Sequence, residues 1–218
     1  MSRKDELENN LSEVNKKIAS VADHDVTLIV VTKSFPASDA VILSELGIRD
    51  FGENRDAEGA EKSQLVPATW HFQGQIQSNK LKSITQWAKV IHSLDDHRHF
   101  ELISKYATHP LSIFLQVSLD GAHHRGGAKI KDLYSLAEAI EKSTEHTLSG
   151  IMAVPPLTMQ ADSAYAQLQQ IHQDFMKEFP GATGLSAGMS GDYEKAISYG
   201  ATHVRVGSSI LGSRSPQR

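Results

Sequence analysis

Residues 182–212 read ATGLSAGMSGDYEKAISYGATHVRVGSSILG and contain a strand, a helix and a second strand in direct succession. The apolar run at 182–188 passes through a glycine-rich turn into a segment with helical spacing at 193–199, and a second apolar run at 202–208 follows Gly200. Two strands that are joined through a helix are expected to lie parallel in one sheet. Parallel strands need such a crossover connection, whereas an antiparallel hairpin needs only a short turn. This stretch therefore predicts a sheet built from repeated β–α units.

The same alternation of apolar runs and helix-patterned segments continues along the rest of the chain. The strand candidates are residues 26–33, 48–54, 69–74, 89–94, 111–119, 148–154, 182–188 and 202–208. Eight parallel strands is the number that closes a (β/α)8 barrel, so we predict an α/β fold with one TIM barrel domain over residues 1–218. An open, doubly wound sheet is the alternative, since both folds alternate strands with helices.

An extra helix precedes the first predicted strand. Apolar residues recur there at spacings of four and three, which is typical of one buried helix face. They are Leu7, Leu11, Val14, Ile18 and Val21. We therefore expect one helix in addition to those of the barrel.

The composition excludes several classes of function. The chain has 218 residues, a net charge of -4 and no cysteine, which removes disulfides, thiolate metal sites and thiol nucleophiles. It shows neither a clustered basic excess for nucleic acid nor an apolar segment that could span a membrane. His92, His97 and His99 have no metal-ligand spacing and are interpreted as surface histidines. We expect a cytoplasmic monomer with no metal, no nucleic-acid partner and no membrane partner.

Lys33 stands at the end of the apolar run at 26–33, where a charged side chain is unusual. In a barrel the carboxyl ends of the strands form the functional face, so Lys33 would lie in the mouth. Burial there disfavours an ammonium and leaves more free amine, which can attack a carbonyl and form a Schiff base.

Two glycine-rich turns predict an anion site in the same mouth. One leads to the predicted helix at 193–199 with Ser190 as its N-cap, and the other passes Gly207 into a short helix. Glycine lets the backbone approach a ligand, and fresh helix N-termini offer unpaired N–H groups to a phosphate. A reactive lysine together with a phosphate site favours pyridoxal 5'-phosphate as the ligand.

Arg205 shares a side of its strand with Gly207, two residues further on. Its guanidinium can therefore lie beside a ring whose phosphate is held at Gly207 and Ser208. A permanently charged arginine next to the pyridine nitrogen would keep that nitrogen unprotonated, and the cofactor would be a weak electron sink.

Several motifs together resemble the pyridoxal phosphate homeostasis protein family, over essentially the whole chain. They are VTKSFP, FGENR, WHFQGQIQSNKLK, GIMAVPP and LSAGMSGDYEKAISYGATHVRVGSSILGSR. The resemblance implies a barrel like the N-terminal domain of alanine racemase.

The resemblance also implies roles for individual residues. Lys33 matches the lysine that forms the Schiff base, Ser190 with Gly207 and Ser208 the phosphate site, and Arg205 the partner of the pyridine nitrogen. Asn54 and Met152 match positions that line the ring, and His71 matches a motif position close to the pocket.

Two departures from the family pattern concern the handling of the cofactor. Phe35 and Arg125 stand where many members have a lysine. A relay of the cofactor between neighbouring lysines is therefore not expected here.

The resemblance implies a non-enzymatic protein that buffers pyridoxal phosphate and delivers it, with apoenzymes that depend on this cofactor as candidate recipients. A racemase-like enzyme is the alternative and would need a second base, for which His71 and Tyr193 are the candidates. A class I aldolase that acts on a sugar phosphate would also use a lysine and a phosphate site.

Overall fold

The computed structural model describes residues 1–122 and 125–213, and its eight parallel strands close into a barrel in sequence order. The strands are β1 (Thr27–Val31), β2 (Asp50–Glu53), β3 (Thr69–Phe72), β4 (Val90–Leu94), β5 (Ser112–Gln116), β6 (Thr147–Met152), β7 (Gly184–Met189) and β8 (His203–Val206). All eight predicted strands are confirmed. The last strand pairs with the first, with Val206 opposite Val30, so the open sheet is excluded.

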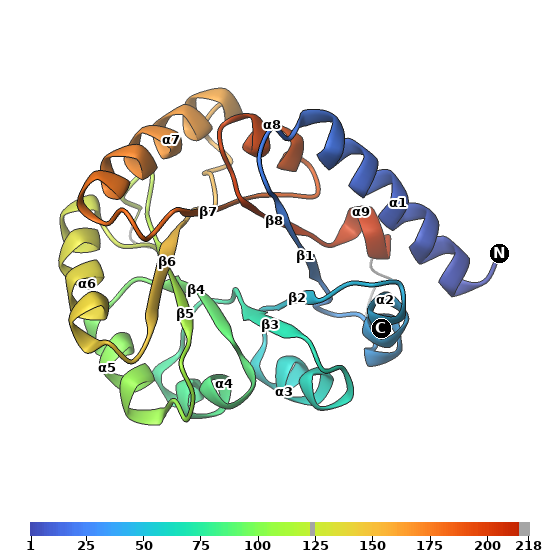
Figure 1. The fold of residues 1–218 in the computed structure, drawn as a ribbon, viewed down its shortest axis with the longest axis horizontal. Coiled ribbons are helices and arrows are strands. Elements are labelled where there is room, and N and C mark those ends of the chain that lie inside the picture. Colours follow the sequence, from blue (N-terminus) through green and yellow to red (C-terminus); the bar gives the residue numbers. More distant parts are fainter. Residues whose placement is uncertain (123–124, 214–218) are drawn as a thin grey trace.

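Helices form a ring around this barrel (Figure 1). They are α2 (Ala37–Glu45), α3 (Asp56–Leu65), α4 (Leu81–Trp87), α5 (His97–Tyr106), α6 (Ile130–Ser143), α7 (Ala161–Glu178), α8 (Tyr193–Ser198) and α9 (Ser208–Leu211), with a short 3-10 helix η1 (Ser78–Lys80) before α4. Their apolar faces pack on the outward side chains of the strands and make the main core.

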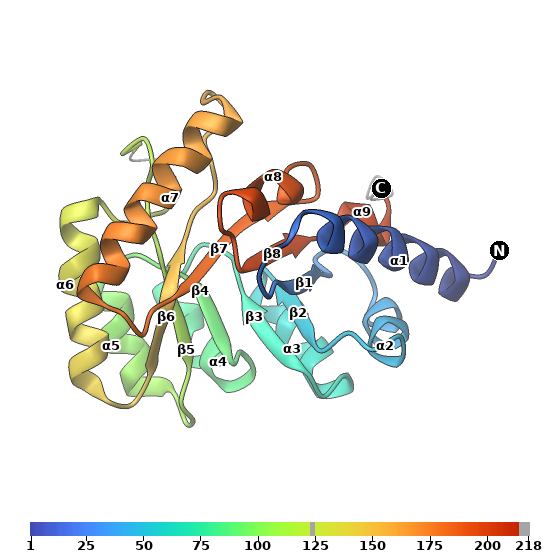
Figure 2. The same cartoon turned by 45° about the horizontal axis from the view of Figure 1, so that its top comes forward.

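The extra helix α1 (Arg3–Val21) lies outside the ring, against α8, α9 and α2 (Figure 2). Ser2 and Asp5 form a capping box that starts it, because each side chain binds the backbone N–H of the other. Four of the five apolar residues expected on its inner face are buried. Val21, the last residue of the helix, is instead exposed.

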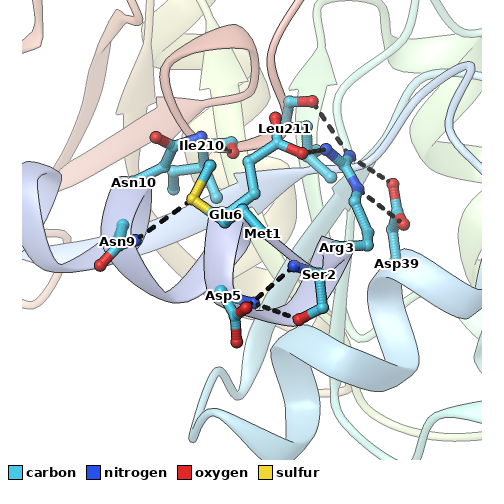
Figure 3. A network of polar contacts seen from close by, with 10 residues as sticks. All are labelled: Met1, Ser2, Arg3, Asp5, Glu6, Asn9, Asn10, Asp39, Ile210 and Leu211. Atoms are coloured by element: carbon cyan, nitrogen blue, oxygen red, sulfur yellow. Dashed lines mark hydrogen bonds and ion pairs between the residues drawn. The ribbon is translucent and has the colours of Figure 1, made fainter.

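Polar side chains tie α1 to the first and last helices of the ring (Figure 3). Arg3 donates to both carboxylate oxygens of Asp39 in α2, at 3.2 and 2.7 Å, and to the carbonyl oxygen of Leu211 in α9 at 3.0 Å. Asn10 donates to the neighbouring carbonyl of Ile210 at 2.9 Å. The last carbonyls of α9 thus have partners on α1, and the position of α9 is fixed from outside.

The interior of the barrel is partly polar. Val90, Phe114 and Met152 form a small apolar cluster there, separate from the main core. His92 in β4 contacts Ser186 in β7, on a strand that is not its neighbour, so the contact crosses the interior. No described helix is long and apolar enough to cross a membrane.

Candidate functional site

A cavity of about 530 Å³ opens at the carboxyl ends of the strands. Seven of the eight residues expected at the site line it: Lys33, Asn54, Met152, Ser190, Arg205, Gly207 and Ser208. Further lining residues, which we did not assign to the site from sequence, are Val31, Phe35, Gln73, Gly74, Gln75, Val154, Met189, Gly191 and Gly212. The cavity therefore joins residues that are far apart in the sequence.

Lys33 lies in a tight turn that follows strand β1. The strand ends two residues earlier than we predicted. Strand β1 ends at Val31, and the N–H of Phe35 donates to the carbonyl of Thr32 at 3.0 Å across the turn. Ser34 has a φ of 66°, in the left-handed region that non-glycine residues rarely adopt. The expected strand to Lys33 is thus wrong at its last two residues, and the turn directs the half-buried Lys33 to the cavity wall.

Four residues, which we call the Lys62 cluster, hold this turn from below: Thr32, Glu53, Glu58 and Lys62. The Lys62 ammonium donates to Oε1 of Glu53 at 2.6 Å, to the carbonyl of Thr32 at 2.9 Å and to Oε2 of Glu58 at 3.2 Å. The hydroxyl of Thr32 also donates to Glu53, at 2.6 Å. Since three acceptors surround Nζ, every N–H of a protonated lysine has a partner.

The two carboxylates of the Lys62 cluster differ in environment. Glu53 is completely buried, and this burial raises its pKa although Lys62 and Thr32 donate to it. Glu58 is less buried, and the N–H of Ser34, which donates to it at 2.7 Å, together with Lys62 outweighs burial and lowers its pKa. The residues on both sides of Lys33 are therefore bonded to one buried ionic group.

The glycine-rich side of the cavity consists of backbone and hydroxyl groups. The hydroxyl of Ser190 accepts hydrogen bonds from the N–H of Gly207 at 3.1 Å and of Ser209 at 3.4 Å. Helix α8 instead has Asp192 as its N-cap residue, so the prediction that Ser190 caps it is wrong. Ser190 links the two turns to each other, which places its hydroxyl and the N–H groups at the start of α9 in one place.

Gly188 explains how β7 reaches this turn. Its φ is 89°, and a Cβ there would lie 2.6 Å from the Cβ of Ala196 and 2.8 Å from the Cα of Tyr193. Only glycine allows α8 to pack this closely on the end of the strand.

Arg205 is buried in the wall of the cavity, with 5% of its surface exposed. It donates from Nη1 to the hydroxyl of Ser186 at 2.8 Å and from Nη2 to the carbonyl of Ala153 at 3.1 Å. Burial lowers its pKa to about 10, so it stays protonated at neutral pH. Among residues 1–122 and 125–213 it has no carboxylate at ion-pair distance. It therefore presents a positive charge to the cavity.

His71 does not line the cavity. It is buried inside the barrel, where its ring contacts His92 and Asp50. The interpretation of His92 as a surface histidine is wrong, because His92 is completely buried and burial lowers its pKa well below the usual value. Its place in a strand, two residues from Val90, was the available signal for an inward side chain. No group of metal-ligating side chains occurs in the described part of the chain.

Gln73 extends from the same strand as His71 to the cavity wall. Its Nε2 atom is buried and has no hydrogen-bond partner among the described residues, which is unusual for an amide. A ligand in the cavity with an acceptor oxygen would satisfy this donor. Its position directly after a strand end is the sequence signal that predicts a place at the mouth of the barrel.

Arg125 lies beside the cavity in the loop after β5. It donates to the carbonyls of Val154 and Pro155 at 2.7 and 3.2 Å and pairs with Asp120 at 3.4 Å. It thereby binds two loops together at the mouth. Phe35, the other departure from the family pattern, contributes an aromatic ring to the cavity wall.

Comparison with known proteins agrees with this geometry. Residues 3–215 match the family model described as alanine racemase, N-terminal domain. The pyridoxal phosphate homeostasis protein of Mycobacterium leprae (strain TN) is 35% identical over 96% of this chain and 93% of its own, and that of Corynebacterium glutamicum is 38% identical over 87% and 90%. The chain therefore belongs to the alanine racemase N-terminal domain family and, within it, to the pyridoxal phosphate homeostasis proteins.

Solved structures share the barrel. PipY of Synechococcus elongatus, in its structure with pyridoxal phosphate bound, is 29% identical over 94% of this chain and 100% of its own, with a TM-score of 0.82. Alanine racemase from Corynebacterium glutamicum is 14% identical over 98% of this chain and 62% of its own, with a TM-score of 0.74, and shows the shared fold alone. The expected TIM barrel with an N-terminal helix is confirmed.

Proposed function

We propose that this chain binds pyridoxal 5'-phosphate in the cavity, as a Schiff base on Lys33, and that it buffers and delivers the cofactor inside the cell. The single observation that carries the proposal is that Lys33, Arg205 and the two glycine-rich turns, which contain Ser190 and Gly207, all line one cavity. The relatives are named for pyridoxal phosphate homeostasis, and PipY has a structure with the cofactor bound. These names support the choice of ligand.

The residues present fit the three polar parts of this cofactor. A phosphate would accept from the hydroxyl of Ser190, whose own proton remains to be donated, and from the N–H of Ser208, while Gly207 holds the Ser190 hydroxyl in place. The pyridine nitrogen would accept a hydrogen bond from Arg205, and Gln73 would donate to an oxygen of the ligand. Asn54 and Met152 would contact the ring from the sides. The aldehyde of a bound cofactor would supply the carbonyl carbon, and the Lys33 amine would join it with loss of water.

Neither side chain that we considered as a second base for racemisation lines the cavity. His71 is inside the barrel, and Tyr193 lies outside it in a hollow beside α7 and α8. This arrangement supports a binding protein without turnover. Exchange of the Cα hydrogen of L-alanine in heavy water is the test, and we expect no more exchange than free cofactor gives. Fast exchange that disappears in Lys33→Ala would establish the racemase-like alternative.

Borohydride reduction of the loaded protein, followed by peptide mapping, tests the covalent link. We expect the reduced cofactor on Lys33 and its loss in Lys33→Ala. Lys80→Ala is the matched control, because this exposed lysine of η1 also follows a strand end and lies outside the cavity lining. Cofactor found on Lys80 or Lys129, with Lys33 unmodified, would refute the assignment.

A further inference from the structure

A chain of four hydrogen bonds runs through the barrel from Arg205 in the cavity wall to Asp50. The bonds join Arg205 to Ser186 at 2.8 Å, Ser186 to His92 at 2.9 Å, His92 to His71 at 2.8 Å and His71 to Asp50 at 3.1 Å. Asp50 is the first residue of β2, so it lies at the amino end of the barrel, and 31% of its side chain is exposed. The cavity is thereby connected to the opposite end of the barrel.

The carboxylate of Asp50 gives every bond in this network its direction when both rings are neutral. A carboxylate only accepts, so Nε2 of His71 donates to Asp50 and Nδ1 of His71 accepts from Nε2 of His92. Nδ1 of His92 is then an acceptor, and the hydroxyl of Ser186, which accepts from Arg205, donates its proton to it. Both rings are neutral in this arrangement, with the proton on Nε2.

Packing holds His92 in the orientation that the chain requires. The ring of Phe114 stacks on His92 at 4.5 Å with an angle of 7° between the planes, and His203 packs edge-on at 6.4 Å. Gly184 leaves the space that Phe114 occupies, since a Cβ there would lie 2.6 Å from the phenyl ring. Burial, with His71 and Arg205 nearby, lowers the pKa of His92 and agrees with a neutral ring.

We propose that Ser186, His92, His71 and Asp50 are positioning residues for Arg205: the chain orients the guanidinium and directs the negative ends of its dipoles toward it. Among these hydrogen-bonded residues only Asp50 is a carboxylate, and it lies at the end of the network away from the cavity. The dipoles of the bonded groups therefore stabilise the charge of Arg205 from within the barrel. This inference rests on the proposed function for its consequence, which is that a bound pyridine nitrogen contacts a cation and stays unprotonated.

The tautomers of His92 and His71 test the proposed direction of the hydrogen bonds, and the measurement needs no cofactor. Two-bond proton–nitrogen NMR spectra of protein labelled with ¹⁵N-histidine report which ring nitrogen carries the proton. We expect the ring proton on Nε2 in both His92 and His71, and we expect Asp50→Ala to give His71 a mixture of tautomers. A proton on Nδ1 of His92, or a doubly protonated ring, would overturn the proposed direction.

Hydrogen exchange of the Arg205 guanidinium tests the positioning. Ser186→Ala should speed the exchange of its Nη protons about tenfold, as expected for the loss of one hydrogen bond to a charged group. Ser93→Ala is the matched control, because Ser93 is a buried strand residue whose hydroxyl has no partner in the described part of the chain. Equal exchange in the two variants would overturn the positioning role, as would an unaltered Asp50→Ala spectrum for the far end of the chain.

Cofactor binding then separates the two proposals. In Ser186→Ala, affinity for pyridoxal 5'-phosphate should fall about tenfold relative to Ser93→Ala, with an altered visible absorption maximum of the bound form. A wild-type protein that shows the expected tautomers but binds no cofactor would refute the proposed function and leave the hydrogen-bonded chain intact. Binding and absorption that are the same in both variants would refute the influence of the chain on the ligand.

Discussion

Two buried groups of polar residues lie beside the cavity: the Lys62 cluster, and the hydrogen-bonded chain from Arg205 to Asp50, which we call the histidine chain. The Lys62 cluster consists mainly of ionised side chains, whereas the rings of the histidine chain are neutral. In the Lys62 cluster an ammonium lies within 3.2 Å of two carboxylates, so ionised groups neutralise one another in direct contact. In the histidine chain the pKa of His92 and that of His203, which packs beside it, are both lowered by burial, so the rings stay neutral.

The difference shows that burial alone does not decide the charge of a side chain. An ion in a dry environment is retained where counter-ions or hydrogen bonds offset its desolvation. The Lys62 ammonium has two carboxylates in contact, whereas the ring nitrogens of His92 contact the uncharged Ser186 hydroxyl and a second imidazole. Removing the charge of Lys62 should therefore destabilise the first region, and protonating a buried histidine should destabilise the second.

Lys62→Met should have the largest effect on stability. It removes the ammonium and leaves the buried Glu53 without its counter-ion, which we expect to cost about 3–5 kcal/mol of the free energy of unfolding in urea. Imine formation at Lys33 should also slow, because the turn loses its support. The exposed pair of Lys142 with Glu138 supplies the control, since Lys142→Met should cost less than about 1 kcal/mol. Similar losses in both variants would mean that the buried cluster is no more important than a surface pair.

Acid should give the second-largest loss of stability, because it protonates the buried His203. Burial, with His71 and Arg205, lowers the pKa of His203 from 6.5 to about 4. Its neutral form is thus favoured by folding, so the stabilisation is present above pH 6.5 and is lost as the pH falls through 4. The difference corresponds to about 3 kcal/mol.

Unfolding in urea at a series of pH values checks this expectation. His203→Gln should flatten the loss of stability between pH 6.5 and 4, whereas the exposed His97→Gln should keep the wild-type profile. Parallel profiles for wild type and His203→Gln would show that this ring does not resist protonation.

Ser190→Ala should have a smaller effect, confined to the ligand. It removes the hydroxyl that bridges the two glycine-rich turns and one donor to the phosphate, while the N–H groups remain. A hydrogen bond to a charged acceptor is worth about 1.5–3 kcal/mol, so affinity for pyridoxal 5'-phosphate should fall by about one to two powers of ten. Unphosphorylated pyridoxal is the control ligand. If both ligands lose affinity equally by titration, the phosphate binds elsewhere.

Arg3→Lys should give the smallest effect. Lysine keeps the charge next to Asp39 but cannot reproduce the two parallel bonds to its carboxylate together with the bond to Leu211. We expect a loss of less than about 1 kcal/mol in the urea midpoint analysis. A loss as large as that of Lys62→Met would place this partly exposed pair among the main supports of the barrel.

The fold could be predicted largely because each strand is apolar and each connection has helical spacing. The seven residues of the cavity could be predicted to converge for the same reason, since strand ends meet in a closed barrel. Their assignment to the cofactor stays a prediction.

Other features depend on partners that lie far away in the sequence. Lys62 has an ordinary helical position four residues after Glu58, and nothing local shows that Glu53 and Thr32 surround it. His92 lies in a polar stretch, and its burial follows from Phe114 and from strands across the barrel. The N-cap role of Ser190 was predicted wrongly because the partner of its hydroxyl, the N–H of Gly207, comes from the following strand–helix unit.

The contact of Arg3 with Leu211 joins residues that are 208 positions apart. Strand β1 likewise needs β8 for one of its two edges. During synthesis, therefore, the first strand waits with an open edge until nearly the whole chain has emerged, and such long-range pairing makes folding slow. The end of the cavity at Ser190, Gly207 and Ser208 is completed last, so under the proposed function a nascent chain could hold the cofactor fully only when its barrel is closed.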